Sequence, residues 1–436
     1  MPRFAFLHSC RPFRLRRALL ALIPVVALAT APALPAGAVD DPDPTSSATE
    51  PAPAASAAFP SSSAIKSWGT AKVDGKPKSQ RVNAIVEAGG VAYLGGQFTK
   101  MVSPSGSKAY RNYLAAIDGT TGNLKSWNPK ANKKVFAMEL SADGKSVYVG
   151  GDFSKIGDRY VSKLAKISLA TGKVDTTFRP KSVSGRVRAL ALDGDRLYVG
   201  GQFGSIDGKS RPKLAAVDAT TGKLLPWTPP SLGRGRYLGQ TGVPTPDYSP
   251  GHVFAVEVID GKVFAGGTFI DFDGQAGLVA MDAATGGLAA PQHSPGRPIF
   301  DLEARAGKLY AAGGGPGGAL FAYDPNSEKP LWRVKVDGDN VGVAVSDTTV
   351  YLAGHYDYIV SKDSSCYQYC PGGPRRQHLS AFSAADGQLL SWNPSADTST
   401  GPFSLAVGPN ALYVGGEFRK INGSAQPGFA IFPGKP

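Results

Sequence analysis

The sequence predicts an all-β fold: a seven-bladed β-propeller of four-stranded antiparallel blades, closed by the N-terminal strand pairing into the last blade. Three observations predict it. A phrase with two glycines recurs, no helical periodicity separates the short strands, and the last repeat lacks its final strand. Short strands and Gly-rich turns that recur about every 50 residues are typical of propeller blades.

Residues 1–38 are predicted to be a signal peptide. Five arginines and no acid precede an apolar run over 18–29, and the small residues Ala36, Gly37 and Ala38 follow it. This run is shorter than the about 20 residues that a membrane-spanning helix needs. We therefore expect a secreted protein, extracellular or cell-wall associated, without a transmembrane anchor. The Sec and twin-arginine export routes both remain open.

Residues 39–63 contain mostly Pro, Ala, Ser, Thr and acids, which predicts a disordered tether, because few large apolar groups are available to offset chain entropy. The predicted propeller covers 64–436. Loss of the signal peptide lowers the formal net charge from +13 to +8. With no Lys/Arg block, this charge favours anionic envelope polymers over nucleic acid. Cys366 and Cys370 are expected to form a disulfide in an oxidising compartment, since two thiols are only half of a tetrahedral zinc set.

The recurring phrase reads aromatic, apolar, Gly, Gly, variable, Phe. It occurs at 93–98, 148–153, 198–203, 264–269 and 413–418, with degenerate copies at 310–315 and 351–356. Apolar stretches and turn dipeptides on both sides predict four strands per unit, a to d. The blades are expected to start near 82, 135, 187, 253, 299, 341 and 403. The glycine pairs are interpreted as close packing between blades, where a side chain would collide.

The seventh unit ends after its third strand. The segment 65–68 reads like the fourth-strand segments 124–127 and 390–392. We therefore expect the N-terminal strand to complete the last blade, which also removes an exposed sheet edge.

The repeated phrase resembles the delta-60 repeat family of bacterial β-propellers, within the WD40/YVTN-like group of propellers. The resemblance spans 64–436. It implies the propeller fold, and it implies no particular activity, because that family has no common one.

Chain reversal at each turn places the b–c loops and the d–a connections on one face of the disc. The insertions 101–110, 231–251 and 355–378 all fall there, so this face is the predicted binding surface. Aromatic rings and cations in the last two insertions suit an anionic glycan or a protein; the candidates are Arg234, Arg236, Tyr237, Tyr356, Tyr367, Tyr369 and Arg375. A polar ring near the channel mouth is also predicted, from Gln97, Asp152, Gln202, Thr268, His355 and Glu417.

Two further sets of residues are ambiguous. The four histidines outside the signal peptide are interpreted as exposed loop residues, because no pair has metal-ligand spacing; they are His252, His293, His355 and His378. Glu139, Glu257 and Glu303 occupy one equivalent position of strand a, next to the channel. Carboxylates there need partners, for which channel water, Arg188 and Arg305 are candidates. A pair of them could also act as acid and base on a glycosidic bond.

The predicted function is a monomeric binding module that engages an extracellular polysaccharide, envelope polymer or protein. No catalytic residue, metal or cofactor is predicted. The alternative is an extracellular enzyme on the same scaffold, a glycan lyase or hydrolase. A quinoprotein-like dehydrogenase is a further alternative, since 216–227 resembles the tryptophan-docking repeat of quinoprotein propellers, although those have eight blades.

Overall fold

The computed structural model describes residues 60–71, 80–233, 237–238, 244–245, 251–270, 276–315, 317–360, 373–398 and 401–436. Every regular element in this part of the chain is a strand. The strands of the large sheets pair antiparallel, so the predicted all-β antiparallel fold is confirmed. No helix among these residues has the length and apolar character needed to cross a bilayer. The predicted signal peptide, most of the predicted tether, Cys366 and Cys370 lie outside the described residues.

Seven sheets follow the repeats within the described residues, and we number them sheet 1 to sheet 7. Sheets 1 to 3 are β2 (Arg81–Ala88), β3 (Val91–Gln97) and β6 (Leu114–Asp118); β7 (Val135–Leu140), β8 (Ser146–Gly151) and β11 (Leu164–Ser168); β12 (Arg186–Asp193), β13 (Arg196–Gln202) and β16 (Leu214–Asp218). Sheet 4 is β19 (Val253–Ile259), β20 (Lys262–Ile270) and β21 (Ala276–Asp282). Sheet 5 is β22 (Ile299–Arg305), β23 (Lys308–Gly313), β24 (Ala319–Tyr323), β25 (Pro330–Val336) and β28 (Ile359–Val360). Sheets 6 and 7 are β26 (Asp339–Val345), β27 (Thr349–His355) and β29 (Leu379–Ser383); β30 (Pro402–Val407), β31 (Ala411–Gly416) and β34 (Phe429–Pro433).

Short two-residue and three-residue strands form hairpins between the second and third strands of several sheets. They are β4 (Lys100–Val102) and β5 (Lys108–Tyr110), joined by β1 (Gly69–Thr70); β9 (Lys155–Ile156) and β10 (Arg159–Tyr160); β14 (Ser205–Ile206) and β15 (Lys209–Ser210); β32 (Lys420–Ile421) and β33 (Ser424–Ala425). A separate pair, β17 (Tyr237–Leu238) and β18 (Pro244–Thr245), follows sheet 3. The first strand of every numbered sheet begins within two residues of the position expected from the repeats.

The glycine pairs lie where neighbouring sheets approach most closely. A Cβ on Gly95 would lie 2.6 Å from Cγ1 of Val135, the first residue of the next sheet's first strand. Gly150 faces Val187 in the same way. Because any side chain would collide with that valine, glycine is needed for packing at this position.

The fourth strand is shorter than the repeats suggested. In sheets 1, 2, 3, 4 and 6 it is reduced to one antiparallel bridge, as between Ile117 and Leu124. Only β25 of sheet 5 forms a full fourth strand within the described residues. The fourth segment therefore lies next to the third strand, as expected, but it forms fewer backbone hydrogen bonds than a full strand would.

In sheets 1 to 6, an aromatic ring of the fourth segment packs on the aromatic residue of the same sheet's glycine phrase. The ring pairs are Tyr93–Trp127, Tyr148–Phe178, Tyr198–Trp227, Phe264–His293, Tyr310–Trp332 and Tyr351–Trp392. The Nε1 of Trp127 donates to the carbonyl of Ser168 in the next sheet at 3.1 Å, and Trp227 donates to Asp282 at 3.1 Å. These tryptophans therefore link adjacent sheets.

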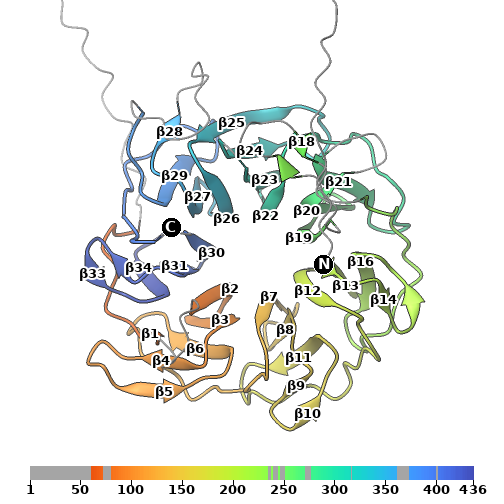
Figure 1. Cartoon of the computed structure of the whole chain (residues 1–436), viewed down its shortest axis with the longest axis horizontal. Helices are drawn as coiled ribbons and strands as arrows, with labels where there is room; N and C mark the ends of the chain where they lie inside the picture. Colours follow the sequence, from red (N-terminus) through yellow and green to blue (C-terminus); the bar gives the residue numbers. More distant parts are fainter. Residues whose placement is uncertain are drawn as a thin grey trace, which may run out of the picture. The chain divides into compact units, whose positions relative to one another are not determined.

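Hydrophobic clusters lie between neighbouring sheets, one for each neighbouring pair in this part of the chain. The cluster that contains Val82 and Phe98 of the sheet 1 repeat also contains Tyr413 and Phe429 of sheet 7. The first strands contact one another in the order β2, β7, β12, β19, β22, β26 and β30, and β30 contacts β2 (Figure 1). The core therefore lies between the sheets, with the first strands facing a common centre.

The N-terminal segment lies against the last strand of sheet 7. The backbone N–H of Ile65 donates to the carbonyl of Ile431 at 3.0 Å, and the two residues form an antiparallel bridge. Trp68 packs on the cluster that contains Tyr413. Ser61, which the sequence placed in the tether, also bonds through its N–H to Pro433 at 2.7 Å. The packed part of the chain therefore extends into the segment 60–63.

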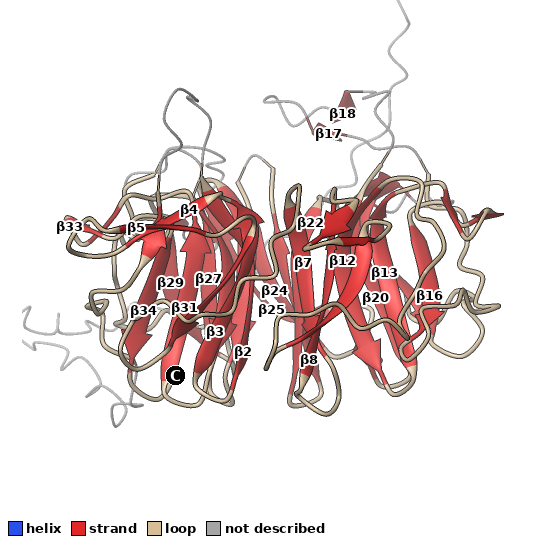
Figure 2. Ribbon diagram, turned by 90° about the horizontal axis from the view of Figure 1, so that it is seen from below, coloured by secondary structure: helices blue, strands red, loops and turns tan. Residues whose placement is uncertain are grey.

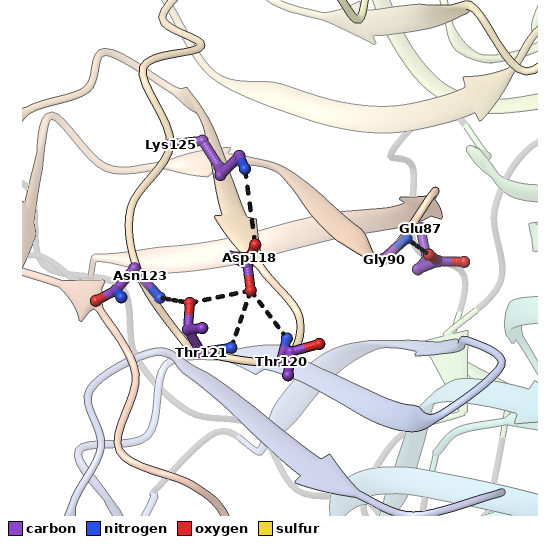
Figure 3. Close-up of polar contacts among 7 residues, drawn as sticks. All are labelled: Glu87, Gly90, Asp118, Thr120, Thr121, Asn123 and Lys125. Carbon is purple, nitrogen blue, oxygen red and sulfur yellow. Dashed lines mark hydrogen bonds and ion pairs between the residues drawn. The ribbon is translucent and has the colours of Figure 1, made fainter.

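The two ends of the sheets differ. The hairpins between second and third strands share one side, seen in Figure 2 from the positions of β4, β5 and β33. We call this side the hairpin face and the opposite side the turn face. On the turn face, one carboxylate oxygen of Asp118 accepts hydrogen bonds from the N–H groups of Thr120 and Thr121 and from the Thr121 hydroxyl (Figure 3). These bonds hold the tight turn before Gly122, whose φ of 71° favours glycine.

Candidate functional site

The first strands of sheets 1 to 7 surround a cavity of about 400 Å³, which we call the channel. Each of these strands contains a β-bulge near its start. A bulge adds one residue to a strand and re-aims its side chain. The bulged residues all line the channel, and we call them the bulge ring: Asn83, Phe136, Arg188, Phe254, Phe300, Val341 and Phe403.

Arg188 is the cation of the bulge ring. Its guanidinium carbon lies 4.8 Å from the centre of the Phe136 ring and 5.2 Å from the centre of the Phe254 ring. Its Nε is buried and has no hydrogen-bond partner among the described residues. A guanidinium held between two aromatic faces keeps its planar hydrogen-bonding edge available to a carboxylate or phosphate. Arg188 is therefore pre-organised for an anion.

Three more cations stand at the hairpin-face end of the channel. Arg81 lies over the Phe403 ring at 4.7 Å, and Nε of Arg186 pairs with Asp152 at 2.9 Å. Burial lowers the pKa of Lys134, and the positive charge of Arg81 lowers it further. Together with Arg188 these residues form the channel mouth. Repulsion among cations would be relieved by a bound anion.

Two acids partly balance the channel mouth. Asp152 forms the ion pair with Arg186. Burial lowers the pKa of Arg81, and the negative charge of Glu417 raises it by a smaller amount. Asp339, the first residue of β26, adds a third acid at this end, and the four cations still outnumber the acids.

A group of carboxyl side chains lies further along the same strands, toward the turn face. Glu139, Glu257 and Glu303 are half-buried and line the channel with Asp301. Burial, reinforced by the charge of Glu257, raises the pKa of Glu139 to about 8. Burial likewise raises the pKa of Glu257 to about 7. We call these four residues the acid cluster.

The other two members of the acid cluster behave in the same way. Burial raises the pKa of Asp301 to about 7, although this carboxylate accepts backbone hydrogen bonds from Val343 at 2.9 Å and Leu302 at 3.1 Å. Burial and the neighbouring acids raise the pKa of Glu303 well above its ordinary value. The cluster therefore retains protons near neutral pH, where a carboxyl can donate a hydrogen bond or act as an acid.

The expected cation partners of these glutamates are only partly present. Arg305 acts on Glu303, yet its guanidinium pairs with Asp347 at 2.6 Å. The charge of Arg188 does not contribute to the pKa shifts of Glu139, Glu257 and Glu303. Of the candidate partners, Arg188 instead lies between the rings of Phe136 and Phe254, where the bulge directs it. Within the described ranges no group of three acids, histidines or cysteines could hold a metal ion.

The predicted polar ring falls beside the channel mouth. Gln97 pairs in register with Arg81, Gln202 with Arg186, and His355 with Asp339. Asp152 and Glu417 act on the mouth cations. Thr268 Oγ1 accepts the N–H of His252 at 3.1 Å. The structure thus brings part of the predicted ring together with a set of cations that the sequence did not single out.

The insertion candidates are placed only in part. Tyr356 is buried, and its hydroxyl bonds to the hydroxyl of Ser380 at 2.6 Å, so it supports the fold rather than a binding surface. Arg375 forms a bridge with Tyr358 at the edge of the insertion. Outside the described residues lie Arg234, Arg236, Tyr367 and Tyr369, and the side chain of Tyr237.

Two of the four histidines are core residues. His293 is 1% exposed, and its ring packs edge-on against Phe264 and Tyr323. His378 is buried and stacks on His355 at 5.8 Å. The interpretation of all four as exposed loop residues is therefore wrong, because His293 takes the place that tryptophan occupies in other sheets.

The bulge ring and Asp301 are functional candidates that the sequence motifs do not mark. A signal was present: Arg188 and Phe136 each follow a valine and precede an alanine at the start of their strands. Aligning the first strands of all repeats would have shown one position that is mostly aromatic. The bulge that points this position into the channel is a property of strand pairing and has no sequence signal of its own.

Comparison with known proteins gives one family similarity. The family model described as outer membrane protein assembly factor BamB matches residues 275–423, about a third of the chain. Among solved structures, the computationally designed Ika8 protein has 12% identity and a TM-score of 0.48, with 82% of this chain and 97% of that chain covered. No curated protein matches. The matched family is of the β-propeller repeat type, in agreement with the β-propeller-like all-β fold; the delta-60 resemblance stays a prediction.

Proposed function

We propose that sheets 1 to 7 are the blades of one closed β-propeller and that the N-terminal segment supplies the last strand of the last blade. The cyclic order of first-strand contacts and the cluster shared by sheets 7 and 1 support this. The bridge between Ile65 and Ile431 supports the closure. Trp68 would then serve sheet 7 as Trp127 serves sheet 1.

We infer that this propeller is an exported, non-catalytic binding module whose ligand presents an anionic group to the channel mouth. Export rests on the predicted signal peptide. The observation that carries the proposal is Arg188, a guanidinium held between Phe136 and Phe254 with a buried Nε that lacks a described partner. A charged group desolvated without a partner is costly, so a carboxylate or phosphate at this point would stabilise the site.

The ligand class follows from the charge distribution. Positive charge at the mouth attracts an anion, and the acid cluster deeper in the channel repels it once those acids ionise. The anionic group is therefore held at the mouth and not drawn through the channel. An acidic extracellular polysaccharide, an anionic envelope polymer or an acidic protein segment meets this requirement, and none needs a cofactor.

Calorimetric titration with monomeric galacturonate tests this function. We expect binding that weakens as salt rises and that falls about 10- to 100-fold in Arg188→Gln, since charge-assisted hydrogen bonds are lost. Arg333→Gln is the matched control, because Arg333 is exposed on the outer strand of sheet 5. Equal affinities of Arg188→Gln and Arg333→Gln would refute the role of the channel mouth.

An enzyme acting on glycans is the second candidate, and the acid cluster favours it. A carboxyl that keeps its proton near pH 7 can protonate a glycosidic oxygen. Release of reducing sugars from acidic polysaccharide by the native protein, abolished in Glu139→Gln, would establish this activity. The quinoprotein-like alternative keeps the support of the family match over residues 275–423, although Trp127 and Trp227 bond to neighbouring sheets and need no cofactor to explain them.

A further inference from the structure

We propose that a groove beside the hairpin of β9 and β10, which belongs to the sheet 2 repeat, is a second binding site, which holds further units of an acidic oligosaccharide. The groove has a volume of about 740 Å³ and is lined by β10 and by residues within 161–164 and 174–181. This size is ordinary for sites that hold small ligands. The proposal extends the proposed function, because the same ligand would continue outward from the channel mouth.

We attribute the groove to a smaller aromatic residue at one position of the sheet 2 repeat. Phe178 holds the place of Trp127 and Trp227, and its ring packs edge-on against Tyr148 at 5.2 Å. A phenyl ring is smaller than an indole and has no N–H to donate to the next sheet. The space beside Phe178 is therefore left open where a tryptophan fills it in sheets 1 and 3.

The walls of the groove are held by hydrogen bonds. The N–H of Lys181 donates to Oδ1 of Asp207 at 2.7 Å, and the N–H of Val183 donates to Oγ of Ser162 at 2.8 Å. The N–H of Arg179 donates to the carbonyl of Thr221 at 2.8 Å. These bonds fix the connection between sheets 2 and 3, so a ligand would find the site largely formed.

The charge of the groove selects an anion. Arg159, Arg179 and Lys181 line it, all three are exposed, and none forms an ion pair with a described residue. Asp175 is the one acid among the lining residues, and its Oδ1 accepts the N–H of Thr177 at 2.8 Å. A positive groove of this kind complements a ligand with repeated negative charges.

The other side chains that line the groove can contact sugar rings. Tyr160 of β10 lines the groove and is 85% exposed, with Nζ of Lys155 at 5.5 Å from its ring centre. A flat aromatic face packs against the apolar side of a sugar ring, while its hydroxyl stays in water. The hydroxyl groups of Ser154 and Thr176 also line the groove and can bond to sugar hydroxyls.

A short stretch of chain joins the groove to the channel mouth. The connection that ends the groove at Lys181 continues to Arg186 at the mouth, five residues later, which is at most about 17 Å of extended chain. Cations at both ends of this short connection would bind successive acidic units of one chain. Binding at linked sites strengthens overall affinity without any new contact.

Galacturonate oligomers of increasing length test the groove by calorimetric titration. We expect affinity to rise with length in the native protein. Tyr160→Ala and Arg179→Gln should each lower the affinity for the longer oligomers by about 10-fold and leave the affinity for the monomer unchanged. The matched control is Tyr110→Ala, because Tyr110 is an exposed tyrosine on the equivalent hairpin of sheet 1, where Trp127 fills the groove position.

The outcomes separate this proposal from the proposed function. Affinity that does not increase with length, or equal effects of Tyr160→Ala and Tyr110→Ala, would overturn the groove. Inorganic polyphosphate bound as tightly as galacturonate, with no effect of Tyr160→Ala, would also overturn it, because charge alone would then explain binding. If Arg188→Gln leaves binding unchanged while Tyr160→Ala weakens oligomer binding, the proposed role of the channel mouth is refuted and the proposed groove is supported. Unchanged melting temperatures confirm that the variants fold.

Discussion

Arg188 and Glu139 line the same channel on neighbouring strands, and burial has opposite consequences for them. Burial lowers the pKa of Arg188, but a guanidinium is so basic that it stays charged at neutral pH. A glutamate starts from 4.5, and burial raises the pKa of Glu139 to about 8. The acid cluster therefore responds to pH near neutrality, whereas the anion-binding mouth does not.

This difference predicts how the free energy of unfolding depends on pH. Folded Glu139 keeps its proton up to about pH 8, and the unfolded chain releases it near 4.5. The folded state binds more protons in between, so this group's contribution to stability falls as pH rises from about 4.5 to 8. Glu139→Gln should raise the free energy of unfolding at pH 8 by ~1 kcal/mol or more, after allowance for screening by channel water.

Thermal melts of the native protein and Glu139→Gln at pH 5 and pH 8 measure this effect. The gain from the substitution should appear at pH 8 and shrink at pH 5. Glu328→Gln is the control, since Glu328 is exposed. The same pH dependence in both variants would contradict a special role of the channel.

At the scale of elements, the outer fourth segments show how sheets are joined. Apart from β25, each contributes little to its own sheet by backbone pairing, often one bridge. The aromatic ring at its end does more, because it packs on its own sheet and its indole N–H can reach the next one. Sheet contact therefore depends on side chains at this edge.

Trp227→Phe tests this link. The substitution removes the bond from Nε1 to the carbonyl of Asp282, while that carbonyl keeps the N–H of Gly286. We expect a loss of about 1 kcal/mol for the hydrogen bond, in addition to the smaller packed area. Trp332→Phe is the matched control, because its Nε1 has no hydrogen-bond partner among the described residues. Urea denaturation measures both, and equal losses would show that packing alone matters.

At the scale of the whole molecule, the chain ends are brought together. Ile65 pairs with Ile431, and Nδ2 of Asn422 donates to the carbonyl of Ser62 at 2.8 Å. These contacts cover the outer edge of β34, which would otherwise offer unpaired backbone groups to other chains.

Removal of this segment predicts a loss of stability and solubility. A chain that begins at Gly69 loses the Ile65 bridge and the packing of Trp68, whereas a chain that begins at Pro60 keeps both. We expect the shorter chain to melt several degrees lower and to aggregate, because an exposed strand edge recruits partners. Thermal melts with light scattering compare the two. Identical melting and scattering would show that closure does not depend on the segment.

Much of the fold could be predicted because it repeats. The glycine phrase marks the second strand of each unit, and the apolar stretches on both sides predict its neighbours. The similarity of segment 65–68 to segment 124–127 predicts that it takes the place of the missing fourth strand. The candidate site could be predicted only in outline. The repeat predicts Asp152 and Glu417 near the channel mouth, but it does not show that Arg188 lies between two aromatic rings or that His293 is a core residue.

The sequence by itself determined the order of strands, the turns and the close contact at glycines such as Gly95, because these depend on local periodicity and on the absence of a side chain. The tertiary structure decided what faces the channel. A bulge turns Arg188 toward Phe136 and Phe254, and burial keeps protons on Glu139 and Asp301. The physical reason is that orientation and desolvation arise between strands far apart in the chain, where no local pattern records them.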